Sequence, residues 1–544
     1  MAHTDRPTAS EQSFLTRAQQ VEQRPPCQVG CPNSGDVRGW LGIIAQRRKH
    51  GLSLEQAYSA AWNRLVELNP FPATIGRICP HPCESRCTRA SKDGAVAIND
   101  LERFLGDWAI AHELALPHSR DRRCVESIGV IGSGPAGLSF AYQMARRGYR
   151  VSVYEKNATP GGMLRHAIPE FRLPRSVVEA EIQRVFDLGV SLQDGVNLSE
   201  DMQDLRERHS LLFLGLGAQR PRRLDIPGDS QVGVVSGFDY LARRKQGKST
   251  KLGASVLVIG GGNTAIDAAR TARRDGAAVT LLYRRSRQEM PAAAAEVDDA
   301  IDEGVRFLFL VAPIKVLGDG KKVTGLDYQH MRLGAPDEQG RRRPMPVKGE
   351  TGRLAADSII VAISQQPDWH DDGWLKTRED GRLANDLWAG GDDTGPGIAS
   401  RAVAQGRLAA QSAHAQLRGE TPLGAPSVAV DVDTGKVRTD FYDERRRHAH
   451  SRLPPKERLE RPEEEVDRTI DSRQASEEAS RCMSCGLCFD CQQCVMYCNA
   501  GGFSRLENTT TGHYFELALD VCEGCGKCVE LCPCGYLTAR QSRD

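Results

Sequence analysis

Cysteine is concentrated at the C-terminal end of this chain. Eleven of the 17 cysteines in its 544 residues lie between Cys482 and Cys534. Two runs in this stretch share the spacing C-x2-C-x2-C-x3-C, and their members are Cys488, Cys491, Cys494 and Cys498, then Cys522, Cys525, Cys528 and Cys532. This spacing is typical of small domains with two [4Fe–4S] clusters, because three cysteines of a run bind one cluster and the fourth binds the other. It therefore predicts a ferredoxin-like domain with one cluster on Cys488, Cys491, Cys494 and Cys532 and another on Cys522, Cys525, Cys528 and Cys498.

Three further cysteines of this stretch, Cys482, Cys485 and Cys534, are in excess of those eight ligands. Because Cys482 and Cys485 continue the x2 spacing into Cys488, a shifted frame also fits a cluster, and the register of the first run stays open. Zinc is the rival occupant, since C-x2-C also forms zinc-ribbon knuckles. A ribbon needs two separated pairs, however, so the successive x2 spacings favour clusters.

The remaining cysteines, apart from Cys124, form a second group, which consists of Cys27, Cys31, Cys79, Cys83 and Cys87. In a long chain such groups indicate cluster or metal ligands, whereas disulfide frameworks belong to small secreted domains. The net charge is only +1, no apolar run approaches the ~20 residues of a membrane span, and residues 1–20 lack an apolar signal core. We therefore expect a cytoplasmic protein of three or four domains that binds neither nucleic acid nor membrane.

A dinucleotide-binding pattern begins at Ser127. A short apolar strand runs into a G-x-G-x-x-G turn, a helix follows to about Arg147, and a second strand ends in Glu155. The three glycines make the turn, admit a pyrophosphate and pack the helix on the strand, and the acidic residue meets a ribose hydroxyl. The expected cofactor contacts are Gly132, Gly134, Pro135, Ala136, Gly137 and Glu155.

A second copy of the pattern begins at Val256. The turn is kept, an alanine replaces the last glycine, and the second strand ends in arginine rather than in an acid. A guanidinium accepts a 2′-phosphate, which a carboxylate would repel, so the first site suits FAD and the second suits NADP(H). If the arginines are only a solvated strand end, NADH is equally acceptable. The expected contacts are Gly260, Gly262, Asn263, Thr264, Ala265, Arg284 and Arg285.

Two nested dinucleotide folds are the layout of pyridine-nucleotide flavoproteins. We expect the first fold to resume with a strand at 357–364, and the later Gly391-Asp392 pair and the helix from about Ala399 to meet the flavin ribityl and pyrophosphate. A hairpin is expected around Gly318–Gly320.

The expected fold class is an α/β multidomain protein with a helical N-terminal iron–sulfur domain, two nested Rossmann-like domains and a C-terminal two-cluster domain. The expected boundaries are 1–120 (helical domain, with a flexible lead-in to residue 25), 121–250 and 356–420 (FAD domain), 251–355 (NAD(P)H domain), 421–475 (a charged linker unable to supply a core) and 476–544 (ferredoxin-like domain).

The reaction class follows from where cysteine is missing. Flavoprotein disulfide reductases need a redox cysteine pair beside the flavin, but no cysteine lies between Ser127 and Arg481. Electrons must therefore pass between NAD(P)H, FAD, iron–sulfur clusters and a partner. Because the cofactors carry this chemistry, no catalytic nucleophile or general base of the protein is expected.

Four separated motifs resemble signatures of the small subunit of NADPH-dependent glutamate synthase and its relatives. They lie at 78–87, 161–174, 261–267 and 283–292, and the resemblance covers about residues 25–420. It implies a helical cluster domain, an FAD domain and a nested NADPH domain. It also implies flavin-side contacts from the second motif, namely Gly162, Leu164, Arg165, Ile168 and Arg172.

Several relatives add a ferredoxin tail that begins as Arg481–Gly486 does here. The chain is most similar to relatives that work with dissimilatory sulfite reductase in sulfur-metabolising bacteria, and other relatives serve aromatic degradation or 2-oxoacid oxidoreductases. The resemblance therefore implies a protein redox partner: a sulfite reductase, a ferredoxin or an oxidoreductase complex.

The N-terminal cysteines depart from the family pattern, because relatives with two N-terminal clusters carry a further C-x2-C before the position of Cys27. Five thiolates cannot complete two four-ligand clusters, so we expect one cluster here. The resemblance implies Cys31, Cys79, Cys83 and Glu102 as its ligands, with Cys27 and Cys87 left over. The alternative is four of the five cysteines, with Glu102 on a helix surface.

The leading hypothesis is an NAD(P)H:acceptor oxidoreductase with FAD, one N-terminal [4Fe–4S] cluster and two more on a mobile C-terminal arm. Cluster potentials vary widely with environment, so the direction of electron flow stays open. The second hypothesis is an obligate electron-input subunit without turnover of its own. An arm that reaches a second protomer would make a homodimer.

Overall fold

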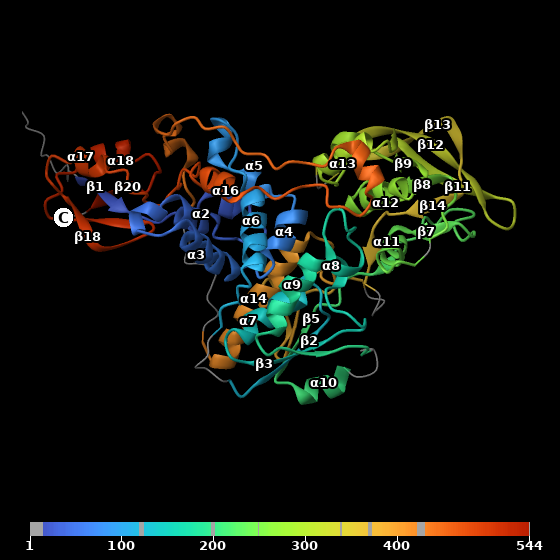
Figure 1. Cartoon of the computed structure of the whole chain (residues 1–544), viewed down its shortest axis with the longest axis horizontal. Helices are drawn as coiled ribbons and strands as arrows, with labels where there is room; N and C mark the ends of the chain where they lie inside the picture. The colour runs from blue at the N-terminus through green and yellow to red at the C-terminus, as the bar shows by residue number, and fades with distance from the viewer. Residues whose placement is uncertain are drawn as a thin grey trace, which may run out of the picture.

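The computed structural model describes residues 15–118, 124–196, 202–248, 250–337, 340–367, 373–420 and 430–542. The first part of the expected lead-in, 1–14, and the start of the expected linker, 421–429, lie outside the described residues. Figure 1 shows a helical body at the centre, with the cysteine-rich C-terminal domain at one end, the second dinucleotide fold at the other, and the first dinucleotide fold below the centre. Among the described residues no helix combines the length and apolarity that a membrane crossing requires.

The N-terminal domain is helical, as expected. Its elements are α1 (Pro26–Gly30), α2 (Val37–Ala45), η1 (Arg47–His50), α3 (Leu54–Val66), α4 (Pro72–Ile78), α5 (Pro82–Ser85), η2 (Thr88–Ser91) and α6 (Ile98–Ala111). A capping box between Ser53 and Gln56 begins α3, and the proline pair at 70 and 72 separates α3 from α4. Helix α4 crosses α6 so closely that a Cβ on Gly106 would lie 2.1 Å from the Ala73 nitrogen.

The N-terminal domain and the first dinucleotide fold share one hydrophobic core. Trp62, Phe71 and Ile75 belong to the same buried cluster as Phe140 and Phe213. The backbone N–H groups of Ala73 and Thr74 also donate to Glu181 of α9, at 2.7 and 2.8 Å. Burial raises the pKa of Glu181 to about 7. The helical domain is therefore fixed on the flavin-type fold rather than tethered to it.

The first dinucleotide fold is built on a six-stranded sheet in the order β16-β17-β5-β2-β3-β4. The strands are β2 (Ser127–Ile131), β3 (Arg150–Tyr154), β4 (Ser191–Gln193), β5 (Leu211–Leu214), β16 (Arg382–Ala384) and β17 (Leu387–Ala389). Its helices are α7 (Pro135–Ala145), α8 (Gly162–His166), α9 (Arg175–Phe186), α10 (Met202–Arg208) and α14 (Ala399–Arg418). All strands but β16 are parallel to their neighbours, so the turns after β2 and β5 meet at one edge of the sheet.

The second fold has a five-stranded parallel sheet in the order β10-β9-β8-β14-β7. Its elements are β7 (Val234–Ser236), α11 (Gly237–Lys245), β8 (Ser255–Ile259), α12 (Asn263–Arg274), β9 (Ala278–Tyr283), η3 (Arg287–Glu289), α13 (Ala294–Asp302), β10 (Arg306–Phe309) and β14 (Ser358–Val361). A three-stranded antiparallel sheet packs beside it and consists of β11 (Val311–Gly318), β12 (Val323–Pro336) and β13 (Arg342–Ala355). The hairpin predicted around Gly318–Gly320 joins β11 to β12, as expected.

The predicted boundaries of this second fold were wrong. The strand expected to resume the FAD fold is β14, and its Ile360 pairs with Val258 of β8, inside the nicotinamide-type sheet. Strand β7, which was assigned to the FAD domain, pairs with the other side of β14. The first fold resumes only at β16, after the short pair β6 (Arg220–Pro221) and β15 (Gln365–Gln366). An apolar run predicts a buried strand, but it does not say which sheet the strand joins.

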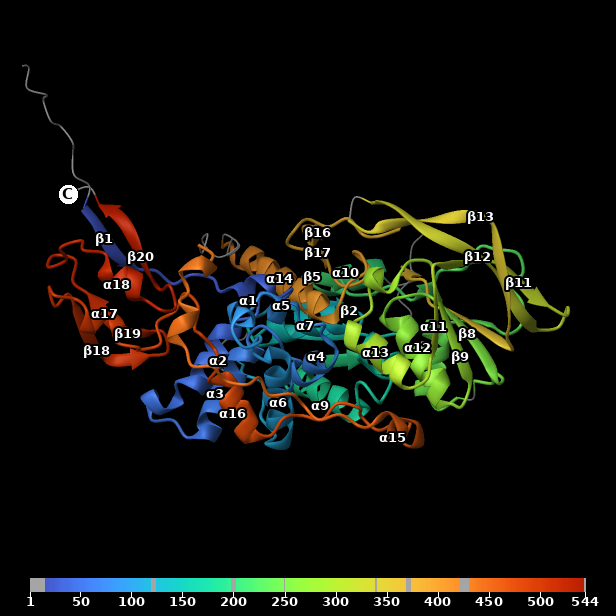
Figure 2. The ribbon, with the colours of Figure 1, turned by 90° about the horizontal axis from the view of Figure 1, so that it is seen from above.

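The expected linker was also misjudged, because its described part does supply core residues. Its elements are η4 (Thr434–Lys436), η5 (Thr439–Phe441), α15 (Pro455–Glu460) and the first half of α16 (Ser472–Ala479), which continues beyond the predicted boundary. Ile470 and Ala475 are buried in the core of the N-terminal domain, together with Ala479 of the predicted C-terminal domain. Figure 2 shows this segment running along the molecule from α15, beside the second fold, to α16. Its few apolar residues are spread among charges, so no hydrophobic period reveals them.

The C-terminal domain takes one strand from the opposite end of the chain. Its elements are α17 (Gln493–Met496), β18 (Phe503–Thr510), β19 (His513–Leu517), α18 (Lys527–Leu531) and β20 (Leu537–Ser542). Strand β1 (Leu15–Gln20), expected to be part of a flexible lead-in, pairs antiparallel with β20 from Leu15 opposite Ser542 to Gln20 opposite Leu537, and the two lie side by side in Figure 2. The pairing satisfies backbone groups that an isolated β20 would expose.

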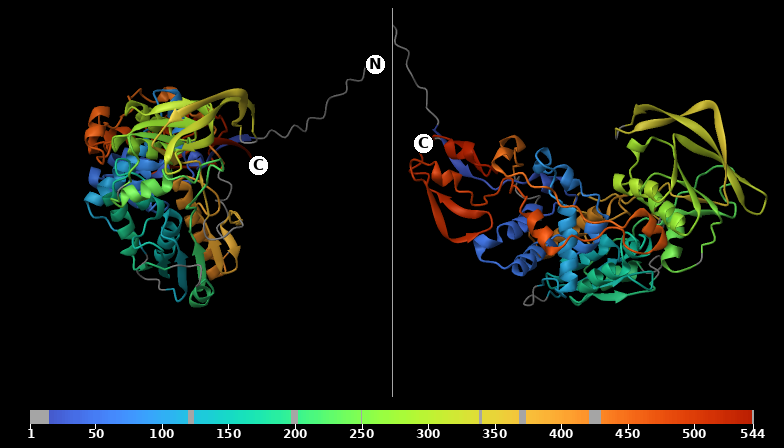
Figure 3. Two further views of the ribbon diagram at one scale, coloured as in Figure 1. Left: turned by 90° about the vertical axis from the view of Figure 1, so that its right-hand side faces the viewer. Right: turned by 45° about the horizontal axis from the view of Figure 1, so that its top comes forward.

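The C-terminal domain, expected as a mobile arm, packs against the helical domain, as the right view of Figure 3 shows. His50 and Tyr514 share a hydrogen bond of 2.7 Å, and the Lys49 ammonium donates to the Asp490 carbonyl at 3.2 Å. Gln23 donates to the Gly535 carbonyl at 2.7 Å. In this structure the domain is docked.

One buried ion pair tests the docking of the segment around α15. Arg458 donates to Asp299 of α13 at 3.0 Å and to the Leu453 carbonyl at 2.6 Å, and its side chain is 4% exposed. We predict that Arg458→Ala destabilises this attachment by about 2 kcal/mol, because the charge-assisted hydrogen bond is lost while Arg452 still partners Asp299. Hydrogen exchange of the peptides covering 453–466 should accelerate.

The matched control lies on the same helix. Lys456 is 90% exposed, and its ammonium forms a long ion pair of 3.9 Å with Glu460. Such an exposed pair contributes little, so Lys456→Ala should change the free energy of unfolding by less than about 0.5 kcal/mol. Equal exchange rates in the two variants would show that the segment is not held by Arg458.

Candidate nucleotide and cluster sites

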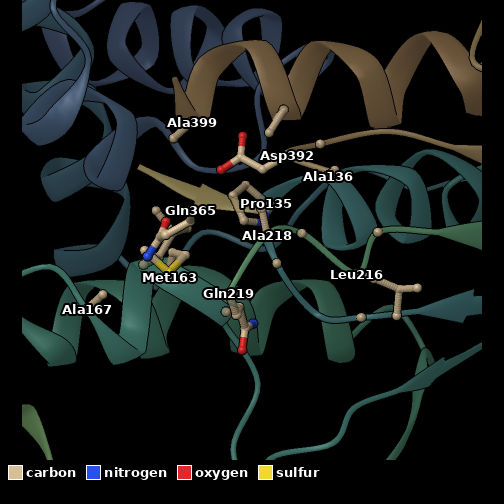
Figure 4. A pocket seen from close by; sticks show the side chains of 18 of the residues that line it. Pro135, Ala136, Met163, Ala167, Leu216, Ala218, Gln219, Gln365, Asp392 and Ala399 are labelled. Carbon is tan, nitrogen blue, oxygen red and sulfur yellow. The ribbon is translucent and has the colours of Figure 1, made fainter. Parts of the chain in front are cut away.

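A cavity of about 630 Å³ lies between the two dinucleotide folds. It opens where β2, β5 and β17 end at the same sheet edge, as expected for a parallel sheet. Figure 4 shows Pro135, Met163, Gln365 and Asp392 around it. The predicted residues that line it are Gly132, Gly134, Pro135, Ala136, Glu155, Gly162, Leu164, Ile168, Arg172, Asn263, Thr264, Gly391, Asp392 and Ala399.

The three glycines after β2 have different environments. Gly132 has φ +93°, and a Cβ there would lie 2.3 Å from the Gly215 carbonyl oxygen. A Cβ on Gly137 would lie 2.0 Å from the Gly132 carbonyl oxygen, whereas one on Gly134 would meet no protein atom within 4 Å. The first and third glycines are therefore needed for packing. The second borders open space at the N-terminus of α7, where backbone N–H groups and the helix dipole favour a phosphate.

The Glu155 carboxylate closes the adenosine end of this site. It is 5% exposed. Its Oε2 accepts from the Ser133 N–H at 3.0 Å and the Ser133 hydroxyl at 2.5 Å, and its Oε1 accepts from the Asn157 N–H at 3.0 Å and the Asn157 side-chain amide at 2.7 Å. These bonds hold the glycine turn to the end of β3. The carboxylate lines the cavity with all its lone pairs engaged, so a ribose hydroxyl that binds it would replace one of these side-chain donors.

Two consecutive carboxyl groups lie near the other end of the cavity. Asp392 lines it and accepts from the Gly397 N–H at 3.1 Å, and burial raises its pKa to about 6. Asp393, which the sequence did not single out, accepts from the Leu216 N–H at 3.2 Å. Burial raises the pKa of Asp393 to about 8. Its carboxyl joins the ends of β5 and β17.

Several further lining residues were missed by the sequence analysis. They are Met163, Gly217, Ala218, Gln219, Ser364 and Gln365 among others. Residues 215–219 follow β5, and the carboxyl end of a central parallel strand is a general ligand position. That position, rather than a motif, could have predicted them.

In the second glycine turn, as in the first, one glycine is packed against the backbone and the next borders open space. Gly260 has φ +148°, and a Cβ there would lie 2.2 Å from the Ala362 carbonyl oxygen, whereas a Cβ on Gly262 would meet nothing within 4 Å. Asn263 and Thr264 begin α12 and line the cavity. Ala265, where a third glycine would stand, is fully buried.

The two arginines after β9 differ in the structure. Arg285 is 7% exposed, donates to the Arg342 carbonyl at 2.8 Å and lies 3.6 Å from Asp337. Arg284 is exposed. Partial desolvation of its guanidinium and the nearby charge of Arg285 lower the pKa of Arg284. Neither arginine lines the cavity, so Arg284 is the one available for a phosphate beyond it.

Two other predicted cofactor residues are engaged elsewhere. Arg172 borders the cavity but forms ion pairs with Asp267 at 2.7 Å and Glu296 at 3.1 Å, so it links the two dinucleotide folds. Arg165 does not line the cavity and pairs with Glu179 at 2.5 Å. The sequence motif gave their proximity to the site but not their partners.

A second cavity, of about 40 Å³, is lined by Cys31, Cys79, Cys83 and Glu102. Burial raises the pKa of Glu102 to about 7, and Asn69 donates to its Oε1 at 2.8 Å. Burial, with a contribution from the Glu102 charge, also raises the pKa of Cys79 to about 12. The alternative that Glu102 lies on a helix surface is therefore wrong.

This cysteine cavity and the large cavity share a wall. Ile78 lines the large cavity and Cys79 the small one, and the same holds for Ala399 and Ser400 at the start of α14. The Cys79 thiol lies 3.7 Å from the Ser400 hydroxyl. Two pairs of adjacent residues therefore separate the nucleotide site from the cysteine site.

The C-terminal domain contains two further cysteine groups. Cys488, Cys491, Cys494, Cys532 and Cys534 line a cavity of about 20 Å³. The Cys534 thiol lies 3.8 Å from that of Cys532, and this contact lowers the pKa of Cys532 to about 6. Cys522, Cys498 and Cys525 lie close enough to Cys528 to add to the effect of burial, which raises its pKa to about 11. The exchange of Cys498 and Cys532 between the two runs stays a prediction.

Cys27 and Cys87, expected as leftovers, also have a cavity, which they share with Cys482 and Cys485. The shifted register Cys482-Cys485-Cys488 is not what the structure places together. Within the described part of the chain, no three histidine, cysteine or carboxylate side chains converge closely enough to hold a single metal ion. The cysteine groups described above instead surround cavities.

Comparison with known proteins defines the class. Residues 126–406, more than half of the chain, match the pyridine nucleotide-disulphide oxidoreductase family, and residues 6–114 match the family described as dihydropyrimidine dehydrogenase domain II, 4Fe–4S cluster. The chain therefore belongs to the pyridine nucleotide-disulphide oxidoreductase family, and it is a multidomain oxidoreductase with a 4Fe–4S domain.

Its relatives narrow the description. The chain is 33% identical to the NADPH-Fe(3+) oxidoreductase subunit beta of Geobacter sulfurreducens, over 85% of this chain and 75% of that one. It is 34% identical to the glutamate synthase [NADPH] small chain of Azospirillum brasilense, over 73% and 88%. Among solved structures, Mycobacterium tuberculosis FprA in complex with NADPH is 18% identical with a TM-score of 0.47, over 66% of this chain and 100% of that one. The resemblance to the glutamate synthase small-subunit family is thus confirmed.

The central glycines give a test that separates cofactor binding from folding. A Cβ on Gly134 or Gly262 would meet no protein atom within 4 Å, so we expect Gly134→Val and Gly262→Val to fold. We predict that Gly134→Val lowers FAD affinity by tenfold or more, a loss of about 1.4 kcal/mol or greater. Gly262→Val should retain FAD but lose reduction by NADPH. Flavin absorbance of the purified proteins, before and after NADPH, measures both.

The control is Gly137→Val, whose Cβ would clash with the Gly132 carbonyl and should therefore disturb the fold itself. If Gly134→Val kept the full FAD content of the wild type, the assignment of the first turn to a pyrophosphate would be wrong.

Proposed function

We propose that this protein passes electrons between NADPH and a protein redox partner through FAD and [4Fe–4S] clusters. The observation that carries this proposal is the wall shared by the nucleotide cavity and the cavity of Cys31, Cys79, Cys83 and Glu102. The chain has no cysteine between Ser127 and Arg481 that could form a disulfide beside the flavin. The thiols behind that wall adjoin the nucleotide cavity, since Cys79 directly follows Ile78, which lines it.

The donor sets fit the proposed groups. The open face of Gly134, the N-terminus of α7, Glu155 and the Gly391-Asp392 turn would hold FAD, and Gly262, Asn263 and Thr264 would hold the nicotinamide nucleotide. When bound, FAD exchanges a hydride with the nucleotide and single electrons with clusters. The chain's own contribution is to place both sites in one cavity and to keep the thiol side dry, since Ile78 and Ala399 cover it.

The cluster ligands that we propose follow the observed groups. Cys31, Cys79, Cys83 and Glu102 would hold one cluster in the N-terminal domain. Cys488, Cys491, Cys494 and Cys532 would hold another, and Cys522, Cys525, Cys528 and Cys498 a third. Cys534 would then donate a hydrogen bond to the Cys532 sulfur, an interaction that tunes cluster potentials.

A preference for NADPH over NADH is supported by Arg284. It is exposed at the end of β9, where an NAD site would carry an acid. Arg285 next to it adds positive charge, although its own donors are partly engaged. Two relatives that carry NADPH in their names, the NADPH-Fe(3+) oxidoreductase subunit and the glutamate synthase small chain, agree with this preference.

The partner would dock on the C-terminal domain. Val495, Met496 and Tyr497 are exposed between Cys494 and Cys498, and Leu519 and Val521 are exposed just before Cys522. Exposed apolar side chains beside proposed cluster ligands are what a redox protein would cover. We propose dissimilatory sulfite reductase as that partner, as for the DsrL-type oxidoreductases that the tail resembles, and a cytoplasmic location for the pair.

A second function fits comparably: an electron-input subunit of a larger complex. The relatives named above and the NADP(+)-dependent formate dehydrogenase subunit beta of Moorella thermoacetica are, by name, subunits or chains of larger enzymes. The two functions differ in one property. An autonomous enzyme reduces artificial acceptors with NADPH alone, whereas an obligate subunit does so only with its partner.

An anaerobic titration tests the proposal. Substoichiometric NADPH should bleach both the flavin bands and the broad iron–sulfur absorbance of the full chain, and NADH should do so less effectively. The Gly262→Val variant serves as the control and should bleach with dithionite only. Bleaching of the flavin alone by NADPH would contradict electron flow from flavin to clusters in the isolated chain.

A further inference from the structure

Four thiols from opposite ends of the chain meet in the N-terminal domain. Cys27, Cys87, Cys482 and Cys485 line a cavity of about 30 Å³, similar in size to that of the Cys31 group. Cys27 lies on α1 and Cys87 precedes η2, whereas Cys482 and Cys485 follow α16. More than 390 positions of sequence separate the two pairs, so only the docking of the C-terminal segment brings them together.

The docking that creates this cavity is firmly held beside Cys482. The guanidinium of Arg481 is 1% exposed and donates to Asp93, Gly94, Ala95, Arg445 and Glu478. Arg89 in turn donates to the Arg481 carbonyl at 2.7 Å. The position of Cys482 is therefore fixed by the buried hydrogen bonds of the side chain and the carbonyl of the residue before it.

Arg38 fixes the other side of the cavity. It lines the cavity, is 3% exposed, and donates to the carbonyls of Cys485 at 2.8 Å and Gln23 at 2.6 Å. Its Nε–H is buried and has no hydrogen-bond partner. A buried, charged donor without an acceptor is costly. An anionic sulfur ligand set in the cavity would supply the missing acceptor.

One sulfur already receives a contact typical of cluster ligands. The Ser484 N–H donates to the Cys482 sulfur at 3.5 Å, whereas the Cys485 thiol donates to the Thr88 hydroxyl at 3.4 Å. Burial raises the pKa of both thiols, and the Arg38 charge opposes it. Hydrogen bonds and a nearby cation stabilise thiolates, the form in which cysteine binds metal.

We propose that Cys27, Cys87, Cys482 and Cys485 bind a fourth [4Fe–4S] cluster, whose ligands come from both ends of the chain. Binding releases the four thiol protons to solvent. A cubane offers one iron corner to each thiolate, so its four ligands surround it at a distance from one another, as these four surround a cavity. A single zinc ion would need them to converge, and among the described residues no such convergence occurs.

With this assignment, both proposed cluster sites of the N-terminal domain have four ligands. The N-terminal domain holds five cysteines and Glu102, which is two ligands short of two four-ligand sites. Cys482 and Cys485 supply those two. They were expected to be surplus, just as Cys27 and Cys87 were expected to be leftovers. One assignment thus accounts for both pairs.

The proposed site also stands between the others along the chain. Cys27 is four residues from Cys31, a proposed ligand of the N-terminal cluster, and Cys485 is three residues from Cys488, a proposed ligand of a C-terminal cluster. Both short segments, from Cys27 to Cys31 and from Cys485 to Cys488, lie in parts of the protein that pack against one another. A cluster here would therefore connect the flavin-side cluster to the C-terminal domain.

Metal content tests this inference on the full chain, independently of any nucleotide. After anaerobic reconstitution with iron and sulfide, the wild type should contain about 16 iron and 16 acid-labile sulfide atoms per chain, rather than about 12. Cys482→Ser should lose about four of each. Cys27→Ser should lose the same four, and the double variant should lose no more, because both residues belong to one site. FAD content should stay unchanged.

The control is Cys124→Ser, since Cys124 belongs to none of the groups and its thiol donates to the Arg147 carbonyl, at 3.6 Å. Its iron content should equal that of the wild type. A wild type with about 12 iron atoms, a Cys482→Ser variant with undiminished iron, or one zinc per chain would overturn the inference. If a variant also lost FAD, and had therefore misfolded, the wild-type iron content alone would decide. Flavin reduction by NADPH tests the proposed function separately.

Discussion

The arrangement depends on the burial of one arginine. The Arg481 side chain donates to Asp93, Gly94 and Ala95 of the N-terminal domain, and to Arg445 and Glu478 of its own C-terminal segment. Burying a guanidinium is favourable only if its donors are satisfied, so the C-terminal segment cannot leave without exposing unsatisfied acceptors on the domain. The requirement to satisfy this one group places Cys482 and Cys485 beside Cys27 and Cys87. It also places the C-terminal domain at a defined position, where β1 completes its sheet.

From that position the cysteine groups form a series. The nucleotide cavity adjoins the cavity of Cys31, Cys79, Cys83 and Glu102 through shared residues of α4 and α14. Cys27 lies on the same short segment as Cys31, and Cys485 lies next to the first C-terminal run. The common hydrophobic core of the helical domain and the first dinucleotide fold fixes the near end of the series. The far end carries exposed apolar side chains next to Cys494, Cys498 and Cys522, where a partner can approach.

Local patterns predicted local structure well. The glycine turns, the strands around them and the hairpin at Gly318–Gly320 are encoded within short windows, because steric and hydrogen-bonding demands act there. The ligand exchange between the two C-terminal runs is predicted by a spacing rule and stays a prediction. Contacts between distant segments were not predictable in this way. Strand β14 could have joined either sheet, β1 has no apolar alternation that marks it as a strand, and the buried residues of the linker are spaced too widely to show a period.

The same limit explains the misread cysteines. Counted within their own segments, Cys27, Cys87, Cys482 and Cys485 are leftovers, because sequence spacing reveals only ligands that are close in the chain. Arg172 shows the converse, since a motif placed it at the site while its ion pair with Asp267 depends on the tertiary fold. Arg165, from the same motif, does not line the cavity and pairs with Glu179 instead.

The central claim is that electrons travel from the nucleotide cavity to the C-terminal domain within a single docked chain. Stopped-flow mixing of the anaerobic, cluster-loaded protein with NADPH tests it most directly, with flavin and iron–sulfur absorbance followed at several protein concentrations and NADPH kept in excess. If electrons travel within one chain, cluster bleaching should follow flavin reduction with a rate constant that does not depend on protein concentration. A rate that rises in proportion to protein concentration would mean that electrons pass between molecules, and would contradict it.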